Sequence, residues 1–290
     1  MPTALPHFTA HFASLAAAYD TVLSDVWGVV HNGQAAAPEA CDALVRFRRQ
    51  GGTVVLITNA PRPGNVVAHS TLDRLAVPRA AYDGIVSSGD VTRALIQARA
   101  GQRVFHIGPP RDLPIFEGLD APTVPLENAH YVLCSGLYDD TRETPQDYDD
   151  LLARMRARGL VMICANPDVV VERGDSLVFC AGAIADPYAA AGGEVVYAGK
   201  PHRPIYEQAL AIAAAARGRT PEHHRVLAIG DSIRTDVIGA AAFGVDCLFL
   251  TGGIHAEELG GRNHADSATL AKLFASAGVT PKAVMHRLAW

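Results

Sequence analysis

Hydrophobic residues in this chain gather in short continuous runs instead of alternating with polar residues. Runs of this kind are typical of strands that are buried on both faces, as in a parallel sheet covered by helices. The pattern predicts strands over residues 21–23, 53–57, 103–107, 130–133, 160–164, 194–197, 225–229 and 245–250.

Alanine- and leucine-rich stretches separate these runs and carry apolar residues at helical spacing. They predict helices over residues 38–50, 66–75, 90–100, 147–157, 203–216 and 235–243, and the spacing of Phe8, Phe12, Leu15 and Tyr19 predicts a further amphipathic helix. Alternation of strands and helices along the whole chain indicates an α/β fold with a doubly wound parallel sheet.

Polar residues that follow predicted strands fall into two blocks, residues 25–59 and residues 200–236. The long stretch between them has predicted strands and helices of its own. Both blocks can line one sheet edge only if this stretch is an inserted domain. We therefore predict a discontinuous core domain, residues 1–81 and 187–290, and an inserted domain over residues 82–186.

Composition narrows the class of protein. The chain has 290 residues, of which 49% are hydrophobic and 19% charged, and its formal net charge is -5, so we expect a soluble protein with no nucleic-acid partner. The N-terminal residues lack a basic segment and a continuous apolar segment, so we expect no secretory signal. No apolar stretch reaches the roughly 18 residues that a membrane span needs. Its five cysteines show no C-x-x-C spacing, which favours buried reduced thiols and a cytoplasmic location.

Candidate chemistry lies where the predicted strands end. Asp25, Thr58 and Asp231 each follow a strand, and ligands of α/β proteins bind beyond the carboxyl ends of the strands. Asp25 can act as a nucleophile that forms an aspartyl-phosphate, and Lys200 can contact a phosphate as a point charge. Asp231 and Asp236 provide oxygen ligands of the kind that suit Mg²⁺.

Each of these residues also has a simpler structural interpretation. Asp25 can cap a turn, and Thr58 with Asn59 can cap the next helix. A single lysine such as Lys200 is more often a surface residue, and Asp236 is favoured at a helix start by the exposed N–H groups.

The order of the motifs is more specific than any one of them. The sequence contains Asp25-x-x-Gly28, then Thr58-Asn59, then Gly199-Lys200-Pro201, then Gly230-Asp231-x-x-x-Thr235-Asp236. This order resembles the haloacid dehalogenase superfamily of phosphatases. Gly33 followed by Pro38, and the segment Ala165-Asn166-Pro167-Asp168, are similar to its subfamily IIA, which includes 4-nitrophenylphosphatase-like, phosphoglycolate and pyridoxal phosphatases.

The resemblance covers roughly the full chain and implies a fold and an activity. It implies a Rossmann-like core sheet with a large α/β cap domain inserted into it, and a phosphohydrolase acting on a small phosphorylated metabolite. The cap would select the substrate, and Asn166 and Asp168 would lie near the boundary between core and cap. A homodimer formed through the cap would also fit.

The resemblance assigns roles to matching positions. Asp25 is implied to be the nucleophile and a direct Mg²⁺ ligand, together with Asp231 and the backbone carbonyl of Trp27, while Asp236 supports the metal. Thr58, Asn59, Asn166 and Lys200 are implied to bind the substrate, with Thr58 and Lys200 acting on the transferring phosphoryl group.

Trp27 departs from the family pattern, which usually has an aspartate there to protonate the leaving group. Indole does not titrate in a useful range, and general acid–base help is worth typically 10²–10⁴-fold. Three hypotheses follow. Another group, such as His31 or the more distant His202, supplies the proton; or the enzyme is restricted to good leaving groups; or the protein binds a phosphometabolite and turns over poorly.

Other enzyme classes lack their motifs. The sequence has no G-x-G-x-x-G after a strand and no G-x-x-x-x-G-K-[ST]. Ser135 is not in a G-x-S-x-G elbow, and the pair His223-His224 lacks zinc-site spacing. In the inserted domain Arg111, Tyr138, Arg142 and Arg173 could meet a polar or anionic substrate, although such residues usually lie on the surface.

Overall fold

The structure, a computed structural model, describes residues 7–173, 176–260 and 266–290. The chain forms two compact units. Unit 1 contains the described residues up to Thr58, the segment Ala68–Val86 and the described residues from Tyr206 onward. Unit 2 contains Asn59–Val67 and the described residues from Ser87 to Ile205. The chain therefore passes between the units several times.

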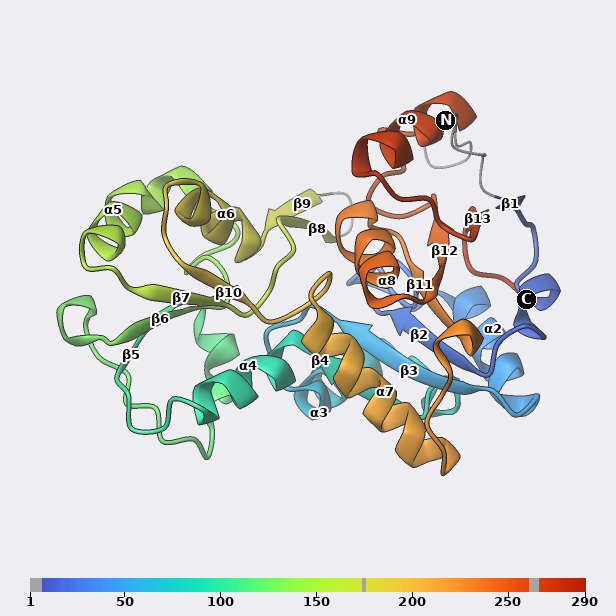
Figure 1. The fold of residues 1–290 in the computed structure, drawn as a ribbon, viewed down its shortest axis with the longest axis horizontal. Coiled ribbons are helices and arrows are strands. Elements are labelled where there is room, and N and C mark those ends of the chain that lie inside the picture. Colours follow the sequence, from blue (N-terminus) through green and yellow to red (C-terminus); the bar gives the residue numbers. More distant parts are fainter. Residues whose placement is uncertain (1–6, 174–175, 261–265) are drawn as a thin grey trace. The chain divides into compact units, whose positions relative to one another are not determined.

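Unit 1 is built on a seven-stranded sheet with the order β1-β13-β12-β11-β2-β3-β4 (Figure 1). Its strands are β1 (His7–Phe8), β2 (Thr21–Asp25), β3 (Thr53–Thr58), β4 (Gly84–Ser87), β11 (Val226–Gly230), β12 (Asp246–Leu250) and β13 (Ala283–Met285). The central strands pair in parallel, with Ser24 opposite Leu56 and Ile229. The carboxyl ends of β2, β3 and β11 therefore lie side by side at one edge.

Helices cover both faces of this sheet. Successive strand residues point to opposite faces, so each face packs against its own helices. On one face Val22, Val54 and Leu227 pack in a single cluster with Leu44 and Phe47 of α2. On the other face the ring of Phe249 in β12 makes an edge contact with Phe274 of α9, with centroids 5.4 Å apart. The α-helices of unit 1 are α1 (Ala13–Ala16), α2 (Pro38–Arg49), α7 (Arg203–Arg217, which begins in unit 2), α8 (Ile238–Phe243) and α9 (Ser267–Ala277).

Several shorter turns complete unit 1. Ala68–Asp73 and Ile233–Val237 are π-helical, and Arg79–Ala81 and His223–Arg225 are short 3-10 turns. The π-helical segment Ile233–Val237 begins directly after the Asp231-Ser232 pair, so the motif Gly230 to Asp236 spans a strand end and the first helical turn.

Unit 2 is built on a second parallel sheet, of four strands with the order β10-β7-β6-β5 (Figure 1). These strands are β5 (Val104–Ile107), β6 (Tyr131–Cys134), β7 (Val161–Cys164) and β10 (Val195–Tyr197), and β8 (Val170–Arg173) pairs with β9 (Ser176–Phe179) in a separate antiparallel ribbon. Its helices are α3 (Gly64–Val67), α4 (Ser88–Gln97), α5 (Asp149–Ala157) and α6 (Gly182–Ala190), with 3-10 turns at Pro110–Phe116, Leu126–Asn128 and Pro145–Tyr148.

The sheet of unit 2 is also covered on both faces. Val132 and Met162 pack with Met155 of α5 and Ile184 of α6. Strand residues of opposite parity pack with Ile96 of α4 on the other face. The predicted fold class is confirmed: the protein is α/β, with a parallel core sheet and a second parallel sheet inserted as a cap.

All eight predicted strands are present, and the structure adds elements that the pattern did not show. The additions are β1, β4, β8, β9, β13, α6 and α9. The predicted amphipathic helix near the N-terminus was wrong in extent, since Phe8 lies in β1 and is 47% exposed, while α1 has a single turn. The domain limits at residues 82 and 186 stay a prediction; β10, which starts at Val195, belongs to the second sheet.

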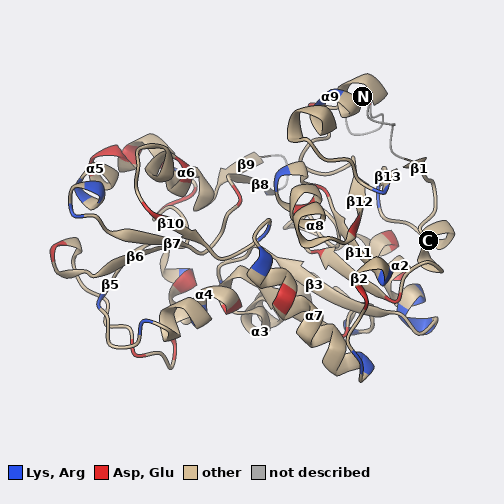
Figure 2. Ribbon diagram, in the orientation of Figure 1, with Lys and Arg blue, Asp and Glu red and all other residues tan. Residues whose placement is uncertain are grey.

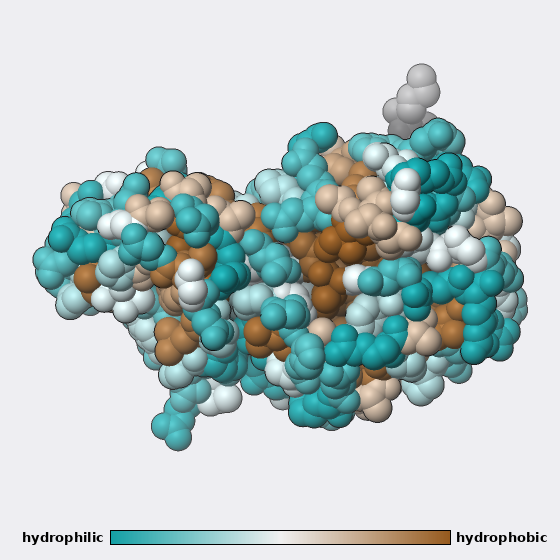
Figure 3. All heavy atoms as spheres, turned by 90° about the horizontal axis from the view of Figure 1, so that it is seen from below, coloured by the Kyte–Doolittle hydropathy of each residue, from teal (hydrophilic) through white to brown (hydrophobic). Residues whose placement is uncertain are grey.

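The described surface agrees with the composition. Basic and acidic residues are interspersed along the ribbon (Figure 2), and the face shown in Figure 3 has hydrophilic residues together with several hydrophobic patches. The five cysteines are buried, and none of them forms a disulfide. Among the described helices, none is long and apolar enough to cross a membrane.

Candidate active site

Three buried carboxylates form a cluster in unit 1. Asp25, Asp231 and Asp236 each offer one carboxylate oxygen, and these oxygens all lie within 4.8 Å of one another. In the described part of the chain this is the one group of acidic, histidine or cysteine side chains with spacing suited to a metal ion. The cluster joins residues that are far apart in the sequence, as the motif order predicts.

The sheet explains the convergence. Asp25 is the last residue of β2, and Asp231 directly follows Gly230, the last residue of the neighbouring strand β11. Asp236 lies one helical turn later, in Ile233–Val237. The carboxyl ends of neighbouring parallel strands meet at one edge, so two strand ends and one helix start bring three carboxylates together.

Main-chain N–H groups hold each carboxylate in place. Val26 N donates to Asp25 Oδ1 at 2.7 Å, and Ile254 N donates to Asp231 Oδ2 at 2.9 Å. Asp236 Oδ2 accepts from Ser232 N at 3.1 Å. These contacts fix the orientation of each carboxylate relative to the other two.

Glycines make room for the cluster. A Cβ at Gly28 or Gly253 would overlap the Asp231 carboxylate, and a Cβ at Gly230 would overlap that of Asp236. Gly28 also has a φ of +84°, a conformation that L residues rarely adopt. Sequence reasoning identified Gly28 and Gly230 but missed Gly253 and Ile254. The sequence feature that could have identified both residues is the turn Thr251-Gly252-Gly253, which directly follows the strand predicted over residues 245–250, now β12.

The donor set suits a hard divalent cation. Like charges at such short separations repel, and a cation between them removes that repulsion. Magnesium binds carboxylate oxygens at about 2.0–2.1 Å in octahedral geometry and is held by few protein ligands. The three carboxylates and the small residues around them therefore fit a bound metal ion.

Thr58 ends β3, the other neighbour of β2, and is 6% exposed. Thr58 therefore lies at the same sheet edge as Asp25, as the order of strands and motifs predicts, and its role there stays a prediction. Asn59 follows it directly in the chain and belongs to unit 2.

Trp27 is half-buried in the turn after Asp25. Its ring makes an edge contact with His31, with centroids 5.0 Å apart, and a Cβ at Gly33 would lie against the indole. His31 is 2% exposed, and its Nδ1 accepts from Gly33 N at 2.9 Å. Burial lowers the pKa of His31 to about 4, so the ring is neutral at neutral pH. His31 therefore has the geometry of a loop-stabilising residue.

In unit 2, Lys200 lies in a buried polar cluster. It is 2% exposed, and its main chain is bonded on both sides by the Asn59 side chain, which also donates to Asp168. Asn166, another predicted substrate-binding residue, accepts from Asp168 N through Oδ1 at 3.1 Å. The structure therefore brings Asn59, Asn166, Asp168 and Lys200 into one connected set. His202, the second candidate proton donor, stacks on the ring of Tyr197.

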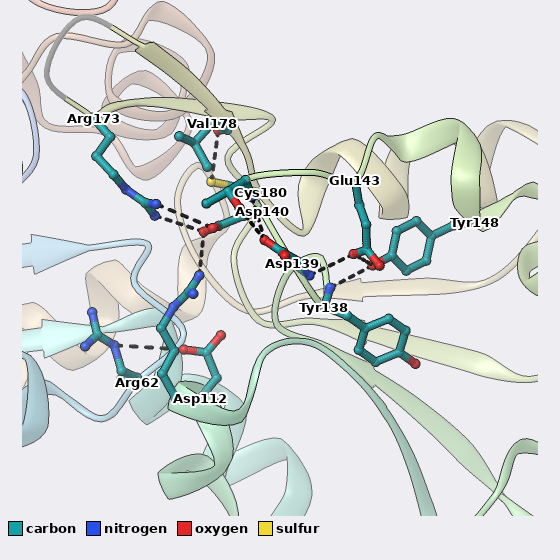
Figure 4. A network of polar contacts seen from close by, with 12 residues as sticks. Arg62, Asp112, Tyr138, Asp139, Asp140, Glu143, Tyr148, Arg173, Val178 and Cys180 are labelled. Carbon is teal, nitrogen blue, oxygen red and sulfur yellow. Dashed lines mark hydrogen bonds and ion pairs between the residues drawn. The ribbon is translucent and has the colours of Figure 1, made fainter.

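The candidate cap residues form a separate network in unit 2 (Figure 4). Arg111 and Arg173 both pair with Asp140 Oδ2, at 2.6 and 2.9 Å. Glu143 accepts from Asp139 N and from the hydroxyl of Tyr148, whose ring stacks on that of Tyr138. Arg142 is a largely exposed residue near Asp139. Arg111 and Arg173 are already paired with Asp140, which favours a structural role for these two arginines.

Comparisons with known proteins agree on one family. A family model described as haloacid dehalogenase-like hydrolase matches residues 22–121, and one described as HAD-hydrolase-like matches residues 197–277. A comparison with curated proteins gives no match.

Solved structures cover nearly the full chain. A haloacid dehalogenase-like family hydrolase from Brucella suis 1330 is 46% identical, with 97% of this chain and 100% of that chain covered and a TM-score of 0.87. A possible sugar phosphatase of the HAD superfamily from Cytophaga hutchinsonii is 20% identical, with 97% and 98% covered and a TM-score of 0.77. A p-nitrophenyl phosphatase from Archaeoglobus fulgidus is 20% identical, with 92% and 95% covered and a TM-score of 0.68.

The last two structures share the fold, while the first is similar enough in sequence to establish the family. The matched segments contain Asp25, Thr58, Lys200, Asp231 and Asp236, the residues on which the motif order depends. The chain belongs to the haloacid dehalogenase-like hydrolase family.

Proposed function

We propose that this protein is a Mg²⁺-dependent phosphohydrolase of subfamily IIA that acts on a small phosphorylated metabolite through an aspartyl-phosphate on Asp25. The observation that carries the proposal is the buried cluster of Asp25, Asp231 and Asp236, whose oxygens lie within 4.8 Å of one another at the carboxyl edge of a parallel sheet. Family membership and the fold shared with a p-nitrophenyl phosphatase support it.

In the proposed reaction an oxygen of Asp25 attacks phosphorus and the bond from phosphorus to the ester oxygen breaks. The alcohol leaves with its electron pair and takes up a proton. Water then attacks the phosphorus of the aspartyl-phosphate, which releases inorganic phosphate and restores the carboxylate. The hydrogen bond from Val26 N fixes the orientation of the attacking carboxylate.

The metal ligands in this proposal are Asp25, Asp231 and the backbone carbonyl of Trp27, with Asp236 in support. Bound Mg²⁺ supplies positive charge that offsets repulsion between the carboxylates and the phosphate dianion. Thr58 and Asn59 bind the transferring phosphoryl group, Lys200 stabilises its charge, and Asn166 contributes to substrate binding.

A second candidate, restriction to good leaving groups, is favoured by the surroundings of Trp27. In this proposal Trp27 stands where the family usually has its general acid, and the ring of His31, which contacts the indole, is buried and bonded to Gly33 N. Loss of general acid help, typically 10²–10⁴-fold, matters least when the leaving group is already a stable anion, as in aryl or acyl phosphates.

The test is Mg²⁺-dependent phosphate release from an aryl, an acyl and an alkyl phosphate. Hydrolysis of the aryl and acyl compounds, with a steep fall in rate as leaving-group basicity rises, supports the restricted phosphohydrolase. Equal hydrolysis of all three points to a proton donor elsewhere, and alkyl activity that survives His31→Ala excludes His31. No turnover, with tight binding of phosphometabolites, would identify a binding protein and contradict the proposal.

A further inference from the structure

The side chain of Asn59 makes three hydrogen bonds, all within unit 2. Its Oδ1 accepts from Lys200 N at 2.7 Å, and its Nδ2 donates to Lys200 O at 3.1 Å. Nδ2 also donates to Asp168 Oδ1 at 3.0 Å. One amide therefore bonds both the N–H and the C=O of a residue that is 141 positions away in the sequence.

These partners fix the orientation of the amide. Lys200 N can only donate, so it must face Oδ1, and Lys200 O and the Asp168 carboxylate accept, so they face Nδ2. An amide nitrogen carries two N–H groups. Both are used by protein acceptors, so the Asn59 side chain has no further donor to give to a phosphoryl oxygen.

The surroundings are built to hold this arrangement. Asn59 is 3% exposed, and a side chain at Gly199 would collide with Asn59 Oδ1 and approach Ser88 Oγ. Asp168, which accepts from Asn59, is itself held through its N–H by Asn166. The position of the Lys200 main chain is therefore set by a buried, connected group of polar contacts, which are expensive to break.

We propose that Asn59 is a positioning residue for Lys200, and that its side chain acts on the reaction only through the lysine. The inference rests on the proposed function, in which the Lys200 ammonium stabilises the phosphoryl group. It also replaces one role given in the proposed function: the Asn59 side chain holds Lys200 and does not itself bind the phosphoryl group. Asn166 becomes part of the same support, through Asp168.

A double-mutant cycle tests the proposal, with kcat and KM measured for an aryl phosphate in saturating Mg²⁺. The variants are Asn59→Ala, Lys200→Ala and the double variant. We expect Asn59→Ala to lower kcat about 100-fold, the loss that a misplacement of about 1 Å can cause. In the Lys200→Ala background the same change should have little further effect, because the group that Asn59 positions is gone.

Multiplicative losses in the double variant would overturn the proposal, since they would mean that Asn59 and Lys200 contact the substrate independently. Asn59→Asp is a second variant, which keeps the acceptor for Lys200 N but loses both donors and places a carboxylate against Asp168. We expect it to be at least as impaired as Asn59→Ala. Asn128→Ala, at an exposed site in the same unit, is the matched control and should behave as wild type.

A second readout does not need activity, because the chain has only three lysines, Lys200, Lys272 and Lys282. With ¹³Cε-labelled lysine we expect three resonances, and the Lys200 signal is identified by its absence in Lys200→Ala. Asn59→Ala should shift the Lys200 resonance and leave those of the exposed Lys272 and Lys282 in place. An unchanged Lys200 resonance would contradict the inference. If wild type is inactive but the resonance shifts, the proposed function fails while the positioning of Lys200 by Asn59 is upheld.

Discussion

The carboxylate cluster of unit 1 and the arginine network of unit 2 differ in the groups that surround their acidic side chains. In unit 1 Asp25, Asp231 and Asp236 bring three carboxylate oxygens within 4.8 Å of one another, and each carboxylate accepts a hydrogen bond from a main-chain N–H group. In unit 2 the side chain of Asp140, which is 7% exposed, pairs with the guanidinium groups of Arg111 and Arg173; Figure 4 shows the pair with Arg173.

The difference lies in how many acidic groups converge on one point: three in unit 1 and one in unit 2. Asp140 has its compensating charge within the protein: although burial raises its pKa, the hydrogen bond from Arg173 and the charges of Arg111 and Arg173 hold the pKa below its usual range. Its network is complete as folded. Three carboxylates at one sheet edge gain most when a cation binds, so they point to metal chemistry. The predictions below separate the two cases, from the largest expected effect to the smallest.

Asp25→Asn should remove turnover, because the amide cannot form the aspartyl-phosphate. We expect a loss of roughly 10⁴-fold or more, the scale on which removal of a nucleophile disables a catalytic unit. Phosphate release from an aryl phosphate measures it. Asp140→Asn is the matched control, an aspartate whose side chain is 7% exposed, with the same substitution, and it should retain kcat. An equal loss of kcat in both variants would mean that Asp25 has no catalytic role beyond that of Asp140, and would contradict the comparison.

Trp27→Asp should add the missing general acid next to the carboxylate cluster. We expect kcat for an alkyl phosphate to rise by about 10²–10⁴-fold, while aryl phosphate hydrolysis changes little. The measurement is the slope of log kcat against leaving-group pKa, which should flatten. Trp27→Phe keeps an apolar ring and should keep the steep slope; a flat slope in wild type would contradict the role given to Trp27.

Asp236→Asn should weaken the metal site without removing the nucleophile. Supporting residues of metal sites typically contribute 10–100-fold to affinity, so we expect Mg²⁺ to bind about 10–100-fold more weakly. Calorimetric titration with Mg²⁺ and the Mg²⁺ dependence of the rate both report it, and kcat should recover at high Mg²⁺. Asp266→Asn, an exposed helix cap in the same unit, controls for the change in net charge. Unchanged affinity in Asp236→Asn would exclude it from the site.

Asp140→Asn should lower stability and leave metal binding intact. Hydrogen bonds to charged groups contribute about 1.5–3 kcal/mol each to stability, and the asparagine amide would keep part of these bonds. We therefore expect the free energy of unfolding to fall by about 1–3 kcal/mol at pH 7. A carboxyl whose pKa is lower in the folded state stabilises the fold above its unfolded pKa, and loses that contribution as pH falls through the folded pKa. The difference in free energy of unfolding between Asp140→Asn and wild type should therefore shrink below about pH 4, near the usual aspartate pKa. Urea unfolding at several pH values measures it, and a difference independent of pH would contradict the ion-pair account.

Much of the fold and the carboxylate cluster could be predicted because both follow from local pattern. Buried strands appear as apolar runs, and parallel strands bring residues at their carboxyl ends together whatever their separation in sequence. That reasoning placed Asp25 and Asp231 at one edge, and the structure agrees. It missed β4, where only Ile85 and Val86 between Gly84 and Ser87 are apolar, and also β13. It missed α6 as well, whose Gly182 and Pro187 disguise its helical pattern.

The polar contacts of unit 2 could not be predicted in the same way. The bonds from Asn59 to Lys200 and Asp168 depend on side-chain orientation and on loops that meet only in the folded chain. Nothing local in the sequence shows that both donors of one amide are used. The same holds for Ile254, whose main-chain N–H binds Asp231 from the loop after β12.

The most direct test of the central claim is to trap the intermediate. Wild type would be mixed with an aryl phosphate and Mg²⁺, quenched in acid, reduced with borohydride and digested for mass spectrometry. The account predicts conversion of residue 25 to homoserine, dependent on both substrate and Mg²⁺, with Asp231 and Asp236 unmodified. Turnover without modification at residue 25, or with modification at another carboxylate, would contradict it.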